Sequence, residues 1–472
     1  MKFEWRESSK RPPGISVSRR DIKSPSNAEP YDSNEPWPLT PDDRPLRESL
    51  LPADVLQSPR SGRVTLPHQG RRTAWIGSVL NLVGGIMGSG MLALPYILAR
   101  CGILVFAILL AVVACVTQYS LVLLLDCARA TREPSYEELG FRAFGPAGRR
   151  AVVVVILLQS FGNITTYMCV IRNTAPVVLA RLFGDEENPP NAELVTTALV
   201  VLVCLPLSHL KDIGVLAIPS AFSVLMYYFF GIIVVIYKFR LHTCRTASGC
   251  TPITSKPMTW ETVSLAVPTM CFSFLCHTQL LPVFEQLKIA DAQGRTRRDR
   301  DRIYSVVRVA VLVSFVIYLL VSFGGYLTFY DSVSRNILDS YMEVAANDMV
   351  ILGVELGFCI SLLFSIPLNN FPLRRALTQL LDIEPTVRQH VALTTTAVLA
   401  ALVLALCIPA ITFVMAFFGA TSAVALVFIL PGLLYIRLSP ESRELQYKLP
   451  AGLLAATGVV VGCVSLARLV GS

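Results

Sequence analysis

The chain carries little charge for its length, and long stretches of it carry almost none. Of its 472 residues, 16% are charged and 53% are hydrophobic, and its mean hydropathy is +0.57. Soluble domains average about 25% charged residues. The composition therefore argues against an ordinary water-soluble domain.

The motifs of common enzymes are also missing from the sequence. It contains no P-loop, no Gly-x-Ser-x-Gly, no paired carboxylates and no cluster of His and Cys at metal-ligand spacing. These patterns carry phosphate binding, nucleophilic catalysis, acid–base catalysis and metal binding respectively. The sequence therefore predicts a protein that is not an enzyme and holds no cofactor.

What the sequence does contain is a series of long apolar stretches. A bilayer core requires about 20 consecutive apolar residues per helix, and too many stretches qualify for all of them to be buried core helices. We predict an all-α polytopic membrane protein with 11 transmembrane helices, at approximately 75–98, 101–126, 150–180, 192–209, 213–237, 261–286, 304–328, 348–371, 390–410, 412–436 and 449–470.

The net charge is +8, and the Lys and Arg residues are distributed unevenly between the predicted loops on the two sides of the membrane. With the N-terminus inside, the inner loops hold eighteen Lys and Arg residues and the opposite loops hold seven. By the positive-inside rule this bias predicts a cytosolic N-terminus. It also makes the lipid bilayer, rather than nucleic acid, the expected partner of the basic residues. An odd number of spans would place the C-terminus outside or in a lumen.

Residues 1–70 differ in composition from the rest. They are rich in Pro, Ser and Asp and poor in apolar periodicity, which is typical of disorder. We predict a disordered cytosolic tail at 1–70 and a transmembrane domain at 71–472. The first apolar run begins only near Trp75, so no signal peptide is expected.

Ten of the twelve cysteines lie in or at the edge of the predicted spans, where cysteine behaves as a small apolar residue. Cys244 and Cys250 lie in a polar loop on the predicted outer side. They are candidates for a disulfide, which an oxidising compartment would favour.

The first predicted span contains a segment unsuited to a continuous helix. Residues 81–96 read NLVGGIMGSGMLALPY, with Gly84, Gly85, Gly88 and Gly90 within seven residues. Each interior glycine costs roughly 1 kcal/mol of helix stability relative to alanine. Close helix packing is one explanation. A break near the midplane is the other, and it is typical of secondary transporters.

The sixth predicted span has a second interruption at a similar depth. It reads LAVPTMCFSFLCHTQLLPVFEQL, with prolines at 268 and 282 around Cys276-His277-Thr278. Two repeats of five spans, each opening with a broken helix, are the pattern of an alternating-access transporter. The second interruption therefore favours a break over close packing.

Four segments are similar to one known family. GSVLNLVGGIMGSGMLALPYILARCGI, PTMCFSFLCHTQLLPVFEQLK, GGYLTFYD and SIPLNNFPLRRAL resemble the amino acid/auxin permease group, in particular the sodium-coupled neutral amino acid transporter family. The resemblance covers roughly residues 73–470. It implies a leucine-transporter-like 5+5 inverted repeat with broken helices 1 and 6, the repeats lying at about 75–237 and 261–436 and an extra helix at about 449–470. The substrate would be a small neutral amino acid taken up with Na+ or H+.

A zwitterionic substrate can be held by the backbone at the two breaks. The amides of Gly88, Ser89 and Gly90 are expected to bind its carboxylate, and carbonyls near Ile86 and Phe274 its ammonium. His277 and Thr278 lie at the second break. His277 matches the Cys-His position of the family; it is either a titrating group or a structural hydrogen-bond partner.

The resemblance also suggests where Na+ would bind. Such sites use hard oxygen ligands from the first and eighth spans. The candidates are Asn81, Gly84, Met87, Ser361 and Ser365. Members of the family commonly have a second asparagine at the position of Gly84, so this chain lacks one side-chain oxygen and H+ coupling gains support.

Other polar residues lie inside the spans, where they are rare and usually functional. Glu355 is a candidate for proton coupling, as is His277. Arg172 is a possible partner of Glu355, or else extends its side chain to the outer face. Gln159 and Asn163 are expected to face the interior of the bundle.

The function that the sequence favours is secondary active transport of small neutral amino acids. The alternative is an amino-acid-binding nutrient sensor with a transporter-like body and a signalling tail; a channel is disfavoured because the spans show no ring of repeated pore residues. We expect a monomer in the plasma membrane or in a vacuolar or lysosomal membrane.

Overall fold

The computed structural model describes residues 68–471 with gaps at 134, 185–189, 211–216, 241–258, 292–296, 346–347, 384, 409 and 440–444. Residues 1–67 of the tail predicted at 1–70 lie outside the described residues, as do Cys244 and Cys250 of the candidate disulfide, whereas residues 68–70 belong to a helix and not to a tail. Residues 64–472 form one compact unit.

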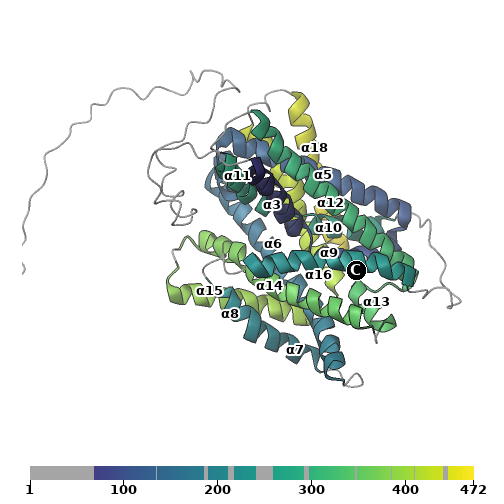
Figure 1. Ribbon diagram of the computed structural model, residues 1–472. Helices are drawn as coiled ribbons and strands as arrows, with labels where there is room; N and C mark the ends of the chain where they lie inside the picture. Colours follow the sequence, from purple (N-terminus) through teal and green to yellow (C-terminus); the bar gives the residue numbers. More distant parts are fainter. Residues whose placement is uncertain are drawn as a thin grey trace, which may run out of the picture. The chain divides into compact units, whose positions relative to one another are not determined.

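Every regular element among the described residues is helical (Figure 1). In chain order the elements are α3 (His68–Ile86), α4 (Gly90–Cys101), α5 (Ile103–Thr131), α6 (Tyr136–Phe183), α7 (Ala192–Leu199), η2 (Val200–Cys204), α8 (Leu205–Ser208), α9 (Ala217–Arg240), α10 (Trp260–Ser273), α11 (His277–Asp291), α12 (Arg297–Phe329), η5 (Tyr330–Ser332), α13 (Ile337–Val344), α14 (Met349–Leu381), α15 (Val387–Cys407), α16 (Ile411–Phe418), η6 (Gly419–Ala423), η7 (Ala425–Ile429), α17 (Leu430–Leu438) and α18 (Leu445–Gly471).

Nine helices of the described residues are long and apolar enough to cross a membrane. The bent pair α3 and α4 makes a tenth span. The predicted fourth span corresponds to Ala192–Ser208, which is apolar but shorter. The count of eleven and the inverted repeat therefore stay predictions, whereas the polytopic helical class agrees with the structure.

The outward faces of the helices are apolar, as a lipid environment requires. On α5, Leu104, Ile108 and Val112 repeat every four residues and are 67%, 54% and 52% exposed. A side chain repeats on the same face of a helix at this spacing. The exposed stripe is therefore the face that the bilayer would cover.

Local signals in the sequence explain where several helices begin and bend. The Ser135 side chain accepts a hydrogen bond from the Glu138 amide at the start of α6. Thr259 and Thr262 form a capping box at the start of α10. Gly145, which has a φ of 65°, bends α6 just before a proline, because a positive φ is accessible to glycine at little cost.

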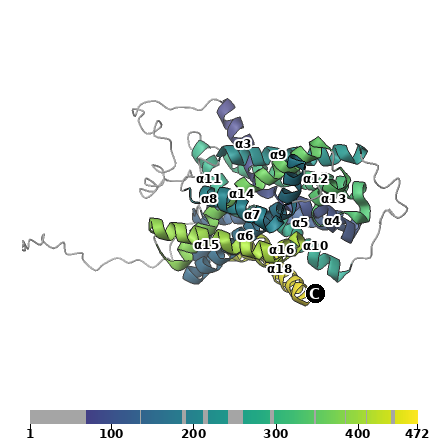
Figure 2. The same ribbon diagram turned by 90° about the horizontal axis from the view of Figure 1, so that it is seen from below.

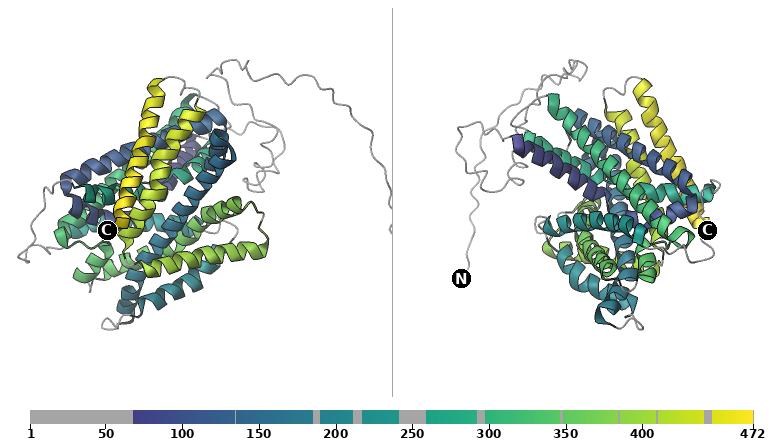
Figure 3. Two further views of the ribbon diagram at one scale, coloured as in Figure 1. Left: turned by 180° about the vertical axis from the view of Figure 1, so that it is seen from behind. Right: turned by 45° about the vertical axis from the view of Figure 1, so that its right-hand side comes forward.

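The helices form two groups of neighbours. Helix α14 lies against α6 and α9, and α15 and the α7–α8 segment pack on the same side (Figures 1 and 2). Helix α12 contacts α3, α4, α5 and α9, and α10 contacts α4, α5, α16 and α18. In Figure 3, α18 runs beside α17 at the C-terminal end of the chain.

Burial separates the central spans from the peripheral ones. In Trp260–Glu285, which contains α10 and the start of α11, 78% of the most apolar window is buried, against 22% in Gln446–Gly471. The second interrupted span is therefore central, and α18 lies at the periphery.

Glycine permits the closest approach between α10 and the segment that follows α16. A Cβ on Gly419 would lie 2.3 Å from the carbonyl oxygen of Pro268. A backbone atom cannot move aside as the end of a flexible side chain can. Gly353 in α14 has no other atom within 4 Å of its Cβ position.

We expect Gly419→Ala to lower the melting temperature of the purified full chain by several degrees, because overpacking costs about 1–3 kcal/mol. The matched control is Gly353→Ala, which should leave the melting temperature unchanged or raise it slightly. Thermal unfolding in detergent measures both. Equal effects of the two substitutions would contradict the close contact at Gly419.

Candidate functional site

The helices are interrupted at both positions that the sequence predicts. Residues 87–89 separate α3 from α4, and the two helices meet at an angle of 57°. Residues 274–276 separate α10 from α11. The structure therefore has an interruption at both predicted positions, with a strong bend at the first, whereas the second lies within one candidate span, Trp260–Glu285.

The two breaks lie against one another. A Cβ on Gly90 would lie 2.5 Å from Oγ and 2.9 Å from Cα of Ser273. On the other side of the first break, a Cβ on Gly85 would lie 1.6 Å from Oε1 of Gln279. Gly90 therefore allows α4 to contact the backbone of α10 more closely than a residue with a side chain would, whereas at Gly85 the neighbour is the end of the flexible Gln279 side chain.

Tyr318 of α12 joins the two breaks. Its hydroxyl oxygen lies 2.8 Å from the carbonyl oxygen of Ile86 and 2.8 Å from that of Ser273, which are the last residues of α3 and α10. A phenol has one proton and donates it to one of the two carbonyls at a time. The C-terminal ends of α3 and α10, which carry partial negative charge, thus both lie at one hydroxyl group.

The first break also presents backbone donors. Among the described residues, the amides of Gly88, Ser89 and Gly90 have no hydrogen-bond partner, and Ser89 is 2% exposed. Unpaired amides at the start of a helix attract an anion. The donors at 88–90 and the acceptors at Ile86 and Ser273 lie on adjacent turns of the same two spans.

Aromatic rings enclose this arrangement. Phe274 is fully buried and meets the ring of Tyr318 edge to face, with centroids 5.0 Å apart. The hydroxyl of Tyr167 in α6 lies 3.5 Å from the Cβ position of Gly88. Neither tyrosine was among the residues predicted from the sequence.

His277 is fully buried at the start of α11. Its Nε2 lies 2.6 Å from Oγ of Ser120 in α5, and Ser120 donates to the carbonyl of Thr117 at 3.0 Å. This pattern assigns the proton to Nε2 of the histidine and leaves Nδ1 as an acceptor without a partner among the described residues. Thr278, the next residue, is half-buried.

The two serines predicted for a cation site lie one turn apart on α14, as expected. Ser361 donates to the carbonyl of Gly357 and Ser365 to that of Ser361, both at 2.8 Å. Two residues of α9 meet them: Ser223 donates to the Ser361 carbonyl at 3.1 Å, and the Tyr227 hydroxyl lies 3.2 Å from Oγ of Ser365. The hydroxyls keep lone pairs that can still act as ligands.

The other half of the predicted cation site faces the same stretch of α9. A Cβ on Gly84 would lie 2.6 Å from Cγ2 of Val224. Met87 is buried, and Asn81 is exposed one turn before Gly84. Residues 223–227 of α9 thus contact both the α3 and the α14 halves of the candidate set.

Glu355 forms a buried ion pair with Arg181 of α6. Oε2 of the carboxylate lies 3.3 Å from Nη1, and the side chains are 0% and 7% exposed. Arg181 also donates to the carbonyl of Met342 in α13, while Oε1 of Glu355 has no partner among the described residues. The pair ties α6, α13 and α14 together.

This contact corrects the partner of Glu355 that the sequence suggests, Arg172; Arg181 lies just beyond the predicted span 150–180. Arg172 instead donates to the carbonyls of Ala405 and Leu406 at 2.8 and 3.1 Å, at the end of α15. Carbonyls at a helix C-terminus attract a cation, so Arg172 is satisfied without Glu355.

The remaining polar residues of α6 face the interior, as predicted. Gln159 donates to Asn163 at 3.0 Å, and Asn163 donates to Asn369 of α14 at 2.9 Å. Ser422 donates to Gln159 at 2.8 Å. This chain of hydrogen bonds connects three spans.

One feature of the sequence does point to Tyr318. Tyrosines of membrane proteins are enriched at the two interfaces, whereas Tyr318 lies mid-span in the apolar run VAVLVSFVIYLLVSF. Ser120 and Tyr227 stand in runs where other hydroxyl residues are common, and no comparable signal distinguishes them.

Comparison with known proteins identifies the family of the chain. The profile of the family described as "Transmembrane amino acid transporter protein" matches residues 71–471. The chain is 32% identical over 418 residues to sodium-coupled neutral amino acid symporter 2 of Danio rerio, covering 83% of this chain and 81% of that protein.

Solved structures resemble the fold. Mhp1, a nucleobase-cation-symport-1 family transporter in a closed conformation with bromovinylhydantoin bound, has a TM-score of 0.51 and 11% identity, covering 84% of this chain and 90% of that one. The manganese transporter of Eremococcus coleocola has a TM-score of 0.48 and 12% identity, covering 86% and 89%. The likeness to Mhp1 concerns the fold alone and supports the leucine-transporter-like class.

The family match over almost the whole described region carries the assignment: the chain belongs to the transmembrane amino acid transporter family.

Proposed function

We propose that this protein moves small neutral amino acids across a membrane by alternating access, in symport with Na+ or H+. The observation that carries the proposal is the pair of adjacent helix breaks. It combines the unpaired amides of Gly88, Ser89 and Gly90 with the carbonyl ends at Ile86 and Ser273.

This combination suits a zwitterion. The amides at the start of α4 would bind the substrate carboxylate, and the two carbonyl ends would accept hydrogen bonds from its ammonium. Tyr318 holds both carbonyls in place until the ammonium competes for them. No charged side chain takes part, so the site favours a substrate of zero net charge.

The side chain of the substrate would lie against an aromatic wall. Phe274, Tyr318 and Tyr167 border the breaks. We infer that three rings beside one break limit the space for the side chain of the substrate. We therefore place small neutral amino acids ahead of aromatic ones.

Exposure around the breaks favours access from one side. Gln279, which covers Gly85, and Asn81 are exposed, whereas Ser89 and Ser273 are each 2% exposed. Asn81 and Gln279 belong to the helical halves nearest the side on which α3 begins. With a cytosolic N-terminus, we interpret this arrangement as the inward-facing state of the transport cycle.

Two ions remain candidates for coupling. The relative named as sodium-coupled supports Na+ as the coupling ion. We place its ligands at Ser361, Ser365 and the carbonyls of Gly84 and Met87. The glycine at position 84 offers no side-chain oxygen, which favours H+ with Glu355 or His277 as the carrier. The membrane would be the plasma membrane or that of a vacuole or lysosome.

Uptake of labelled alanine and glutamine by proteoliposomes tests the proposal and the ion together. We expect uptake under an imposed Na+ gradient, with Ser365→Ala raising the Na+ concentration for half-maximal uptake about tenfold, which corresponds to about 1.4 kcal/mol. Uptake that follows a pH gradient alone would assign coupling to Glu355 or His277. Binding without uptake under either gradient would reject transport and favour the nutrient sensor.

Tyr318→Phe should reduce the maximal uptake rate about tenfold or more. It removes the donor shared by two buried carbonyls, and an unsatisfied buried polar group costs about 1–3 kcal/mol. The matched control is Tyr228→Phe, at a half-buried tyrosine of α9, which should transport normally. Uptake by Tyr318→Phe equal to that of the control would argue against this arrangement of the breaks.

Glu355→Gln should strongly destabilise the protein, because breaking a buried ion pair from one side costs about 3–5 kcal/mol. The double replacement Glu355→Leu with Arg181→Met should recover most of the melting temperature, since neither charge is then left buried and unpaired. Uptake measured on the stable double variant separates the roles. Preserved pH-driven uptake would exclude Glu355 as the proton carrier.

A further inference from the structure

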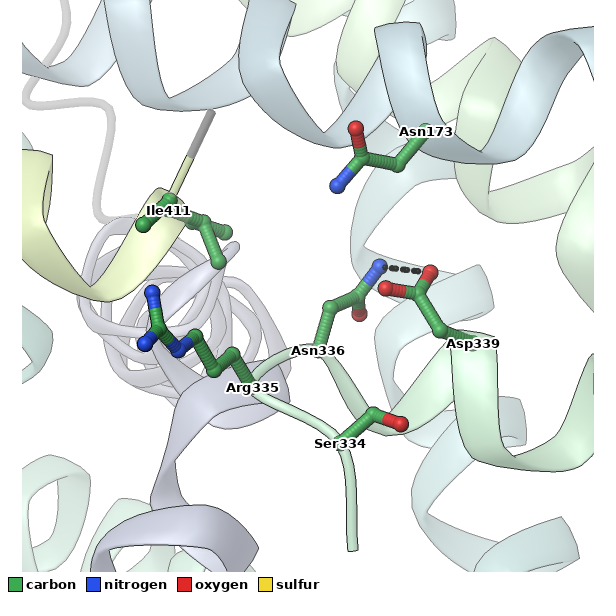
Figure 4. Close-up of a pocket in the computed structure, with 7 residues that line it drawn as sticks. Asn173, Ser334, Arg335, Asn336, Asp339 and Ile411 are labelled. Carbon is green, nitrogen blue, oxygen red and sulfur yellow. Dashed lines mark hydrogen bonds between the residues drawn. The ribbon is translucent and has the colours of Figure 1, made fainter. Parts of the chain in front are cut away.

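A second polar cavity lies away from the helix breaks. It has a volume of about 300 Å³ and is lined by side chains of α6, of the segment leading into α13, and of the start of α16 (Figure 4). Ligand sites for small molecules begin at about this size. Among its lining residues are Asn173, Arg335, Asn336, Asp339 and Ile411.

The cavity lies on the side of the membrane opposite to the start of α3. Asn173 lies near the end of α6, the segment 334–339 follows α12, and Ile411 begins α16 after α15 has crossed. Successive crossings put these ends on one side, which is the outer or luminal side if the N-terminus is cytosolic.

The segment that forms the cavity also packs above the outer half of the first broken helix. Ile337, which follows Asn336, inserts its Cδ1 within 2.2 Å of the Cβ position of Gly325. Pro95 of α4 lies 3.0 Å from the same position. The cavity is thus separate from the breaks, but Ile337, next to its lining residue Asn336, packs beside Pro95 of α4, the helix that begins at the first break.

Two opposite charges face the cavity without meeting. Arg335 is exposed and forms no ion pair or hydrogen bond with a described residue. The Asp339 carboxylate accepts a hydrogen bond from Asn336 at 2.8 Å through Oδ1 only, so Oδ2 keeps its acceptor capacity. Figure 4 shows the guanidinium and the carboxylate on opposite sides of the cavity.

The other lining groups complete a small recognition set. The side-chain amide of Asn173 has no partner among the described residues and extends into the cavity from α6 (Figure 4). Ile411, which is buried, supplies an apolar wall. A guanidinium, a carboxylate, an amide and an apolar surface are the groups that recognise a free amino acid.

We propose that this cavity is a second amino-acid site, in which Arg335 binds the substrate carboxylate and Asp339 binds its ammonium. The side chain of the substrate lies against Ile411. The proposal rests on the proposed function and extends it: the outer site holds an amino acid while the breaks are open to the opposite side, which raises the local substrate concentration for the next cycle.

The charge of Asp339 suits this role at neutral pH. Burial and the nearby Glu343 raise the pKa of Asp339 to about 6, while the hydrogen bond from Asn336 acts in the opposite direction. The other charges around it are Arg335 in the cavity and Glu355 of α14, which is paired with Arg181. Because the carboxylate is ionised above about pH 6, ammonium binding at this site weakens as the pH falls through that value.

Equilibrium binding of labelled alanine to the full chain in lipid nanodiscs tests the second site. The wild type should bind two alanines per chain. Arg335→Gln and Asp339→Asn should each bind one, or bind the second at least ten times more weakly. Arg335→Lys should retain the second site in part, and Arg308→Gln, which removes an exposed charge in α12 outside the cavity, should retain it fully.

Analogues distinguish recognition from a structural effect. At the outer site the wild type should reject alanine methyl ester, which lacks the carboxylate, and N-acetylalanine, which lacks the ammonium. Arg335→Gln should lose the preference for alanine over the methyl ester, and Asp339→Asn should lose the preference over N-acetylalanine. In uptake, both variants should raise KM severalfold and leave the maximal rate unchanged.

The outcomes separate this inference from the proposed function. One alanine per wild-type chain, with an affinity unchanged in both variants, would overturn the second site even if transport occurs. Two alanines per chain without uptake would overturn transport and leave the outer site standing. Unchanged analogue selectivity in both variants would also count against the assigned contacts.

Discussion

The hydrogen-bonding needs of the unwound backbone at residues 87–89 and 274–276 constrain the rest of this structure. In a bilayer, a backbone group that lacks an intrahelical partner must find one inside the protein. Here each break is placed against the other, glycines at 85 and 90 permit the approach, and Tyr318 supplies a donor for the carbonyl ends of α3 and α10. Among the described residues, the amides of 88–90 remain without a hydrogen-bond partner in this arrangement, and unpaired amides at the start of a helix attract an anion.

Helix α9 links the first broken span to the helix that carries the candidate cation ligands. Helix α9 contacts the first broken span through Val224 and the serines of α14 through Ser223 and Tyr227. A shift of α9 relative to either neighbour would therefore change both halves of the candidate cation site. This linkage gives the proposed ion and the proposed substrate a shared structural element, since α3 ends at the break itself.

On the side of the bundle opposite to the start of α3, a buried ion pair connects the helices. Arg181 joins the ends of α6 and α14 to α13, through Glu355 and the carbonyl of Met342. Helix α13 in turn contacts α4 and begins one residue after Asn336, which lines the outer cavity. The contacts of the buried ion pair and the position of the proposed outer site thus both involve one short helix of eight residues.

The sequence by itself determined the membrane class, the position of both breaks and the one-turn spacing of Ser361 and Ser365. These features are local: apolar length, clustered glycine and proline, and helical period act within a few turns of the chain. The tertiary structure alone decided that Arg181 rather than Arg172 meets Glu355, that Tyr318 reaches both breaks, and that Arg335 and Asp339 share a cavity with Asn173. Tyr318 and Ile86 are 232 residues apart, and Arg181 and Glu355 are 174 apart. Contacts at such separations depend on how the helices pack and rotate against one another, which no local pattern in the chain specifies.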